Sequence, residues 1–302
     1  MLPEIKLLPN ELDLINNMQD HKIKSYFGAW IDSIDELKEK FYNSKPVKHV
    51  IIDNFLNADF IKKCTEDFPT DFLENPAWYK YNNPIEVKYL NDNLETFSVH
   101  QKDLVYLLSS KYITGLFRYI TGMDLEIDPY IHGGGIHVYP RHGRLGIHLD
   151  YERHIYLKDK QRQLNVILYL SENWKPEWKG DTQLWSNDCK KCEISSPVVF
   201  NSALIFQTSD LSWHGVPERL MCPENVHRSI LTYYYLSPLE SKKNTEKFGA
   251  NEDGYRYKAS FVKRPEDPEL QQMKELYKIR PNRRIEKEDM VKIWPEWTPE
   301  LF

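Results

Sequence analysis

Gln163-Leu-Asn-Val-Ile-Leu-Tyr-Leu170 alternates with a period of two residues and contains no glycine or proline. A strand places successive side chains on opposite faces of a sheet, so this period is typical of a β-strand and not of a helix. We therefore expect a strand over these residues. Asn165, Ile167 and Tyr169 then share one face of it.

Further runs of the same kind surround this strand. Clusters of glycine, proline, asparagine and aspartate separate them at short intervals, which indicates several short strands joined by loops. No helical pattern lies between them, so a Rossmann-type sheet is excluded. The prediction is a sandwich or barrel, in a mainly β chain with flanking helices (α+β). The additional runs are Ile136–Tyr139, Val198–Phe200, Ala203–Phe206 and Ser229–Leu236.

The segment before these strands is mostly helical in its pattern. Ile34, Leu37 and Phe41 have helical spacing, and Pro46 ends that helix. A short strand is expected at 49–53. A helix capped by Asn57 is expected at 58–67, followed by two helices within 102–122 that cover the sheet.

The segment after Pro238 is polar and charged. A helix is predicted over 267–277, with Pro268 near its first turn. The aromatic end, Trp294 to Phe302, is expected to pack back on the body or to contact a partner. We divide the chain into supporting elements at 1–130, a β core at 131–240 and an extension at 241–302 that packs on the core.

Composition narrows the functional classes. The 302 residues are 28% charged and 41% hydrophobic, with a net charge of −5, so no general affinity for nucleic acid is expected. No apolar run is long enough to span a membrane, and the N-terminus lacks the apolar core of a signal peptide. The four cysteines are too few for a disulfide scaffold, which favours a cytoplasmic location.

His148-Leu-Asp150 is the strongest sign of chemistry. In a strand or extended loop, His148 and Asp150 point to the same side and can chelate one ion. His214, in Ser212-Trp-His-Gly-Val-Pro, supplies a third ligand from a distant strand. Two imidazoles and a carboxylate without thiolate suit Fe(II) and leave open coordination positions. Arg228 begins an apolar strand, where its burial without an anion would be costly. We interpret it as the clamp for the distal carboxylate of 2-oxoglutarate.

These motifs resemble the Fe(II)/2-oxoglutarate-dependent oxygenases, and in particular their prolyl-4-hydroxylase-like branch. The resemblance covers about a third of the chain, from Gly133 to Pro238. It implies a double-stranded β-helix (jelly-roll) core with the iron inside one mouth. The matching segments are His137–Pro140, Leu145–Tyr151, Leu164–Trp174, Trp178–Trp185, Ser212–Pro217 and His227–Leu231.

The resemblance also implies roles for individual residues. It assigns iron ligation to His148, Asp150 and His214, and 2-oxoglutarate binding to Arg228. Tyr139 and Tyr169 match tyrosines that can hydrogen-bond 2-oxoglutarate in this family. Strand parity adds Asn165 and His137 as weaker site residues. The cofactors implied are Fe(II), 2-oxoglutarate and O2, with ascorbate as an accessory reductant.

Three features of the sequence bear on the shape of the pocket and on which branches of the family the chain resembles. Gly180-Asp-Thr-Gln-Leu replaces the Gly-Gly-x-Leu that is common in this family, which bears on the shape of the pocket. Asp150 argues against the halogenating relatives, where a small residue replaces the carboxylate. No second arginine follows Arg228 at short spacing, which weakens an interpretation as a nucleic-acid demethylase.

The predicted activity is hydroxylation of an unactivated C–H bond with release of succinate and CO2. The activity is expected to be prolyl-hydroxylase-like, with either peptidyl proline or a small molecule as the substrate. The alternatives are a non-catalytic module that senses 2-oxoglutarate or O2, or a cupin-like metal-binding protein or isomerase, which would not need Arg228. The oligomeric state stays open. Cys189 and Cys192 resemble half of a zinc knuckle, but without a second pair they are expected to be free thiols in a hairpin loop.

Overall fold

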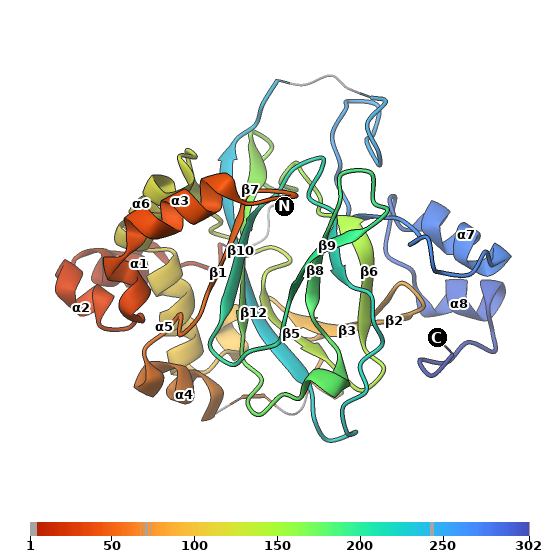
Figure 1. The fold of residues 1–302 in the computed structure, drawn as a ribbon, viewed down its shortest axis with the longest axis horizontal. Helices are drawn as coiled ribbons and strands as arrows, with labels where there is room; N and C mark the ends of the chain where they lie inside the picture. Colours follow the sequence, from red (N-terminus) through yellow and green to blue (C-terminus); the bar gives the residue numbers. More distant parts are fainter. Residues whose placement is uncertain (1–4, 67, 70–71, 73, 242–244, 302) are drawn as a thin grey trace.

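The computed structural model describes residues 5–66, 68–69, 72, 74–241 and 245–301. Helices gather at the two ends of the chain and strands in its middle, as Figure 1 shows. The helices are α1 (Pro9–Asn16), α2 (Asp20–Lys24), η1 (Ala29–Asp32), α3 (Ile34–Asn43), α4 (Ala58–Glu66), η2 (Leu94–Thr96), α5 (Val99–Leu108), α6 (Lys111–Thr121), η3 (Pro176–Trp178), α7 (Gln271–Ile279) and α8 (Lys287–Ile293).

The strands form one antiparallel sheet that curls until it is nearly a closed barrel (Figure 1). Its order is β1-β10-β7-β12-β5-β3-β6-β11-β8-β9, with β13 beside β6, β2 beside β3 and β4 beside β12. The strands are β1 (His49–Ile52), β2 (Tyr79–Asn83), β3 (Glu86–Asn91), β4 (Glu126–Ile127), β5 (Gly135–Tyr139), β6 (Arg144–Leu149), β7 (Lys160–Tyr169), β8 (Thr182–Trp185), β9 (Cys192–Ser196), β10 (Ala203–Gln207), β11 (His214–Val216), β12 (Arg228–Pro238) and β13 (Ser260–Phe261).

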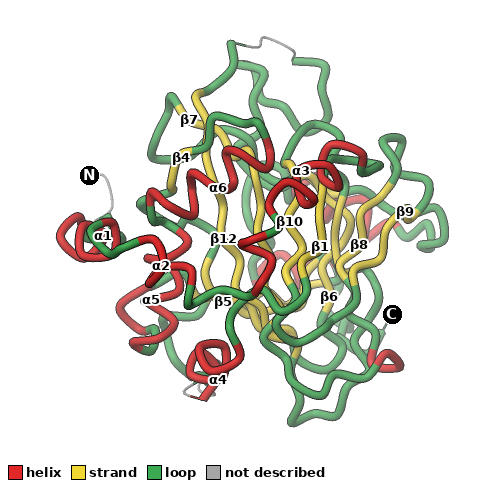
Figure 2. Tube along the Cα trace, turned by 60° about the vertical axis from the view of Figure 1, so that its left-hand side comes forward, coloured by secondary structure: helices red, strands yellow, loops and turns green. Residues whose placement is uncertain are grey.

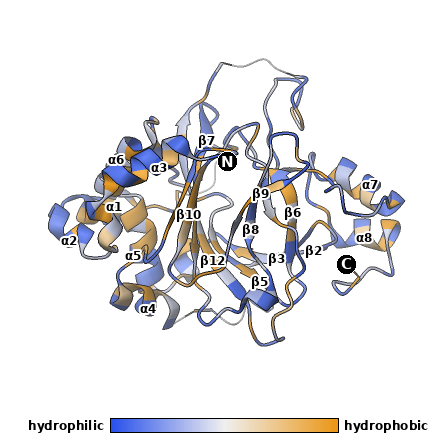
Figure 3. Cartoon of the chain, viewed as in Figure 1, coloured by the Kyte–Doolittle hydropathy of each residue, from blue (hydrophilic) through white to orange (hydrophobic). Residues whose placement is uncertain are grey.

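The strand β7 shows how the sheet separates two buried layers. Leu164, Val166 and Leu168 pack in the cluster formed with the N-terminal helices. Ile167 and Tyr169 belong instead to the cluster inside the barrel. The parity predicted for this strand is therefore confirmed. Both faces of the sheet are covered, so the central strands are buried, and β10 is hydrophobic along most of its length (Figure 3).

The helices α1 to α6 lie together on one side of the sheet (Figures 1 and 2). Their ends follow local rules of capping. Ser98 and Gln101 form a capping box at the start of α5, and Ser110 caps α6. Gly122 ends α6 in the left-handed conformation with φ of 69°. The predicted cap at Asn57 is confirmed, because its Oδ1 accepts from the amides of two residues at the start of α4.

The C-terminal region returns to the barrel. β13 pairs with β6, so that Phe261 lies opposite His148. Trp294 and Trp297, in the aromatic end of the sequence, are buried in the same cluster as the interior of the barrel. Of the helices in the described ranges, none has both the length and the apolar character that crossing a bilayer requires.

Most predicted elements are confirmed, and the differences have local causes. Residues 198–200, predicted as a strand, form the turn that leads into β10. The helix predicted over 267–277 begins at Gln271, after Pro268, whose ring disfavours a helical residue before it. The helix predicted over 58–67 is described to Glu66, and Asp67 lies outside the described residues. Cys189 and Cys192 are free, within the hairpin of β8 and β9, as predicted.

Candidate metal and co-substrate site

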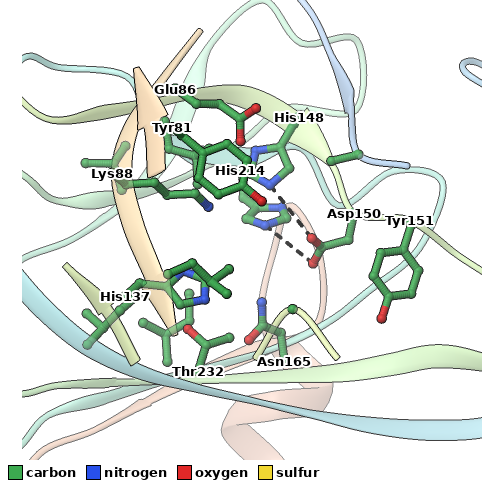
Figure 4. Close-up of a pocket in the computed structure, with 18 of the residues that line it drawn as sticks. Tyr81, Glu86, Lys88, His137, His148, Asp150, Tyr151, Asn165, His214 and Thr232 are labelled. Atoms are coloured by element: carbon green, nitrogen blue, oxygen red, sulfur yellow. Dashed lines mark ion pairs between the residues drawn. The ribbon is translucent and has the colours of Figure 1, made fainter. Parts of the chain in front are cut away.

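His148, Asp150 and His214 meet at one end of the barrel (Figure 4). His148 on β6 pairs directly with His214 on β11, and their ring centroids lie 4.3 Å apart. Asp150 follows β6 directly. Its Oδ1 lies 3.8 Å from Nε2 of His148, and its Oδ2 lies 3.7 Å from Nε2 of His214. Within the described part of the chain, this is the one group of three whose ligand atoms, all within 4.8 Å, can hold a metal ion.

The two imidazoles are oriented by their other ring nitrogens. Nδ1 of His148 lies 2.9 Å from the carbonyl oxygen of Gly146, and Nδ1 of His214 lies 2.7 Å from that of Ser212. Because a carbonyl only accepts, each Nδ1 carries the proton and each Nε2 keeps a lone pair toward the centre. Burial lowers the pKa of both rings, so they are neutral, as metal ligands must be.

Asp150 is buried but remains ionised. Burial alone would raise its pKa, but the positive charges of Arg162 and Lys88 oppose that effect, and the pKa is lowered. Nη1 of Arg162 donates to Oδ1 over 3.3 Å. Oδ2 is buried and has no hydrogen-bond partner among the described residues. A buried carboxylate oxygen without a partner, beside two free imidazole lone pairs, fits a bound cation.

Arg228 is fully buried at the start of β12, with 0% of its surface exposed. Its Nε donates to the carbonyl of Gly180 over 2.6 Å, and its Nη2 donates to Oγ1 of Thr182 over 2.8 Å. Nη1 has no partner among the described residues. Arg228 lines the same cavity as the three candidate metal ligands. The guanidinium is therefore held in place with one donor unused, which fits the carboxylate of a bound acid.

Three other residues predicted from the sequence also line this cavity. Tyr139 lies opposite Arg228 in the ladder of β5 and β12, and Cζ of Arg228 is 4.8 Å from its ring centroid. Burial raises the pKa of Tyr139, so its hydroxyl stays protonated and is able to donate. Oδ1 of Asn165 and Nε2 of His137 are buried without a partner in the described structure. Each of these groups faces the space where a co-substrate would lie.

Tyr169 lies behind the cavity and does not line it. Its hydroxyl lies 2.9 Å from Oγ1 of Thr182 and 3.1 Å from Oγ of Ser196. Thr182 in turn accepts from Arg228. The ring centroid of Tyr169 lies 5.4 Å from Cζ of Arg228, while its hydroxyl points to Thr182 and Ser196. Direct contact of Tyr169 with 2-oxoglutarate stays a prediction from the sequence.

Several residues of the site were not predicted from the sequence. The guanidinium of Arg162 lies between the rings of Tyr151 and Tyr234, 3.5 and 3.4 Å from their centroids. Lys88 on β3 also faces the cavity, and it lies between the apolar Val87 and the aromatic Tyr89. A charged residue inside an apolar run is the feature that would have identified it.

The C-terminal region supplies one wall of the cavity. The ring of Phe261 stacks on that of His148, with centroids 4.9 Å apart and planes 22° apart. Nε of Arg256 donates to the carbonyl of Asp150 over 3.2 Å. Tyr257 and Lys258 line the cavity between these two contacts. Chain beyond the predicted β core thus encloses the metal-facing side of the barrel and limits the access of water.

Comparison with known proteins agrees with this geometry. Residues 134–236 match the family described as the 2OG-Fe(II) oxygenase superfamily. A search of curated protein sequences found no match. The structure resembles a prolyl hydroxylase from Trichoplax adhaerens, solved with a peptide fragment of the oxygen degradation domain of hypoxia inducible factor. The TM-score is 0.50 and the identity 17%, over 70% of this chain and 94% of that one. At this identity the likeness shows a shared fold, the double-stranded β-helix.

Two other prolyl 4-hydroxylases are similar at lower scores. The enzyme from Pseudomonas putida has a TM-score of 0.49 and 17% identity, over 66% of this chain and 97% of that one. The enzyme from Phytophthora capsici has a TM-score of 0.47 and 18% identity, over 83% of this chain and 72% of that one.

Proposed function

Since residues 134–236 match the 2OG-Fe(II) oxygenase superfamily, we propose that this chain is a dioxygenase that hydroxylates a prolyl substrate. Fe(II), 2-oxoglutarate and O2 supply the oxidising chemistry that inserts a hydroxyl into a C–H bond, with release of succinate and CO2. The prolyl group belongs to a peptide or to a small molecule. The protein's own part is to hold these reactants and to keep water away from them.

We assign the iron to His148, Asp150 and His214. The support for this assignment is the pair of oriented Nε2 atoms and the unpartnered Oδ2 of Asp150. Arg162 keeps the carboxylate ionised and aimed at the ion. Three ligands on one side leave the opposite side open to the co-substrate and O2.

The unused donor of Arg228 is the observation that carries the assignment of 2-oxoglutarate. A buried guanidinium with an open Nη1, in the same cavity as three metal ligands, needs an anion. We propose that Arg228 binds the distal carboxylate, whose opposite end reaches the iron. Tyr139 and Asn165 contact the same molecule, and Tyr169 acts through Thr182.

The substrate class, the domain boundaries and the location in the cell are also part of this proposal. A similar structure is that of a prolyl hydroxylase bound to a peptide, and we extend a peptide or small-molecule substrate to this chain. The division at 130 and 240 stays part of the proposal, with the extension as a wall of the site. We also propose a cytoplasmic location, which the four thiols without a disulfide support.

Succinate release tests the proposal. Purified protein is incubated with Fe(II), 2-oxoglutarate and a panel of proline-containing peptides and small molecules. We expect succinate release that depends on a member of the panel. His148→Ala should reduce it to background, because two ligands do not hold the ion in place. His142→Ala is the matched control, since His142 lies outside the cavity lining, and it should retain full release.

Other outcomes would contradict parts of the proposal. Equal succinate release by wild type and His148→Ala would remove the assigned iron site. Binding of metal and 2-oxoglutarate without succinate release from any compound would favour a sensing module. Full activity without 2-oxoglutarate in Arg228→Ala would favour a cupin-type isomerase.

A further inference from the structure

Basic side chains outnumber acidic ones around the cavity. Six lysines and arginines line it against three carboxylates, which leaves an excess of three positive charges. Bound Fe(II) and the two carboxylates of 2-oxoglutarate cancel one another, so this excess remains when both are present. The residues are Lys88, Arg162, Arg228, Lys258, Arg280 and Arg284 on one side and Glu86, Asp92 and Asp150 on the other.

The three carboxylates already have cationic partners. Asp150 accepts from Arg162, and Glu86 forms a two-point ion pair with Arg280 in which Nη2 and Oε2 lie 3.3 Å apart. Asp92 pairs with a lysine of the N-terminal segment, outside the cavity, over 2.8 Å. Arg228 is assigned to 2-oxoglutarate. What remains is a set of three cations, Lys88, Lys258 and Arg284, for which the described residues provide no carboxylate within ion-pair distance.

These three cations come from distant parts of the chain and line one cavity, where two of them lie beside the ring of Tyr81. Nζ of Lys88 lies 5.4 Å from the ring centroid of Tyr81, and Cζ of Arg284 lies 5.3 Å from it. Lys258 precedes β13 and lines the same cavity. Figure 4 shows the ammonium of Lys88 beside Tyr81, directed into the space that the candidate metal ligands also face. The three positive groups therefore face the same cavity as the candidate metal ligands.

This arrangement is costly in the free protein. Lys88 is only 7% exposed, so little of its charge is solvated. Its burial lowers its pKa to about 8, against the opposing effect of Glu86. The pKa of Lys258 is also lowered, by burial and by the neighbouring Arg284 and Arg280. Lys88 is buried and Lys258 and Arg284 are half-buried, and positive charges that repel one another with little solvation are stabilised by a bound anion.

We propose that Lys88, Lys258 and Arg284 bind an anionic group of the primary substrate, a carboxylate or a phosphate. This rests on the proposed hydroxylase function, because it concerns the molecule that the site oxidises. The anion lies apart from the co-substrate, since none of the described contacts of Arg228 involves these three residues. Binding the anion at this place fixes which end of the substrate enters first and thereby which C–H bond faces the iron.

Sulfate binding tests the anion site without any turnover. Sulfate is titrated by calorimetry, under argon, into protein loaded with Fe(II) and saturating 2-oxoglutarate, so that Arg228 is occupied. We expect saturable binding at one site, weakened roughly ten-fold or more in Arg284→Met and in Lys258→Met. Lys278→Met, an exposed lysine on α7, is the control for a general change in charge and should bind as wild type does. No saturable binding in wild type, or unchanged binding in both variants, would overturn the inference.

Paired compounds identify the source of the anion. L-proline is compared with L-prolinamide, and acetyl-Pro-Glu-amide with acetyl-Pro-Gln-amide, by substrate-dependent succinate release. Preference for the acid in the first pair indicates a small molecule, and in the second pair an acidic peptide. Equal release from acid and neutral members overturns the inference and leaves the hydroxylase proposal intact. Sulfate binding without succinate from any compound supports the anion site and contradicts the proposed prolyl substrate.

Discussion

Arg162 holds the carboxylate of Asp150 at 3.3 Å while its own guanidinium lies between the rings of Tyr151 and Tyr234. The two rings fix the plane of the guanidinium, and the guanidinium fixes the carboxylate. An interaction of this kind orients a metal ligand and keeps it ionised before the ion arrives.

Arg162→Met should therefore weaken metal binding. We expect roughly a ten- to hundred-fold loss of affinity, which is typical for the loss of a residue that orients a ligand. Titration of Fe(II) or Co(II) under argon measures it. Arg118→Met on α6, outside the cavity, is the control. Unchanged metal affinity in Arg162→Met would show that Asp150 is positioned without it.

Thr182 contacts both Arg228 and Tyr169, and this predicts losses of 2-oxoglutarate affinity of different size when Thr182 or Tyr169 is changed. Thr182→Val removes the acceptor for Nη2 of Arg228, and we expect roughly ten-fold weaker binding of 2-oxoglutarate. Tyr169→Phe acts only through Thr182 and should cost less, roughly two- to five-fold. Calorimetry with Fe(II)-loaded protein under argon separates the two. An effect of Tyr169→Phe as large as that of Arg228→Met would instead indicate direct contact with the co-substrate.

Lys88→Met should stabilise the metal-free protein. The folded state lowers the pKa of Lys88 from 10.5 to about 8, so its burial as a cation costs on the order of 3 kcal/mol at pH 7. Between these two pKa values the unfolded chain binds more protons than the folded one, so wild-type stability rises with pH. The gain from Lys88→Met is thus full below pH 8 and is lost by pH 10.5. Urea unfolding at pH 7 and at pH 10 measures it, and an equal gain at both values would show that the buried charge of Lys88 is not its source.

Gly215→Ala should disrupt the pairing of β11 with β6. A methyl group at this position would lie 2.7 Å from the carbonyl oxygens of Gly146 and Leu145, so the backbones must separate beside His214. We expect a loss of about 1–3 kcal/mol in the free energy of unfolding, with weaker metal binding. Gly115→Ala on α6 is the matched control. It meets no atom within 4 Å and should stabilise the helix by about 0.5–1 kcal/mol.

The iron ligands and Arg228 could be predicted because their signals are local. A spacing of two residues in an extended segment sets the direction of His148 and Asp150 without knowledge of the fold. Arg162 could not be found this way, because β7 has a bulge. Leu164 pairs with Tyr235 while Arg162 pairs with Leu236, so Gln163 is the extra residue. Simple alternation would place Arg162 with Leu164 against the helices, and the bulge turns it into the cavity.

The three cations without a carboxylate partner among the described residues could not be predicted from the sequence for a different reason. Lys88, Lys258 and Arg284 are separated by many residues; the pairing of β3 and of β13 with β6 brings the first two together, and Arg284 follows α7. Strand partners over such separations depend on the whole topology. The same holds for Tyr169, whose face was predicted correctly but whose distance from the cavity depends on the packing of β8 behind it.

The wall formed by β13 comes later in the sequence than the candidate ligands that it covers. A ribosome delivers all three ligands and Arg228 before it delivers Arg256, Phe261 or Arg284. A nascent or truncated chain that ends near Pro238 has a complete ligand set without the ring that stacks on His148. The residues that cover the ligands are therefore encoded after the residues that would hold the ion.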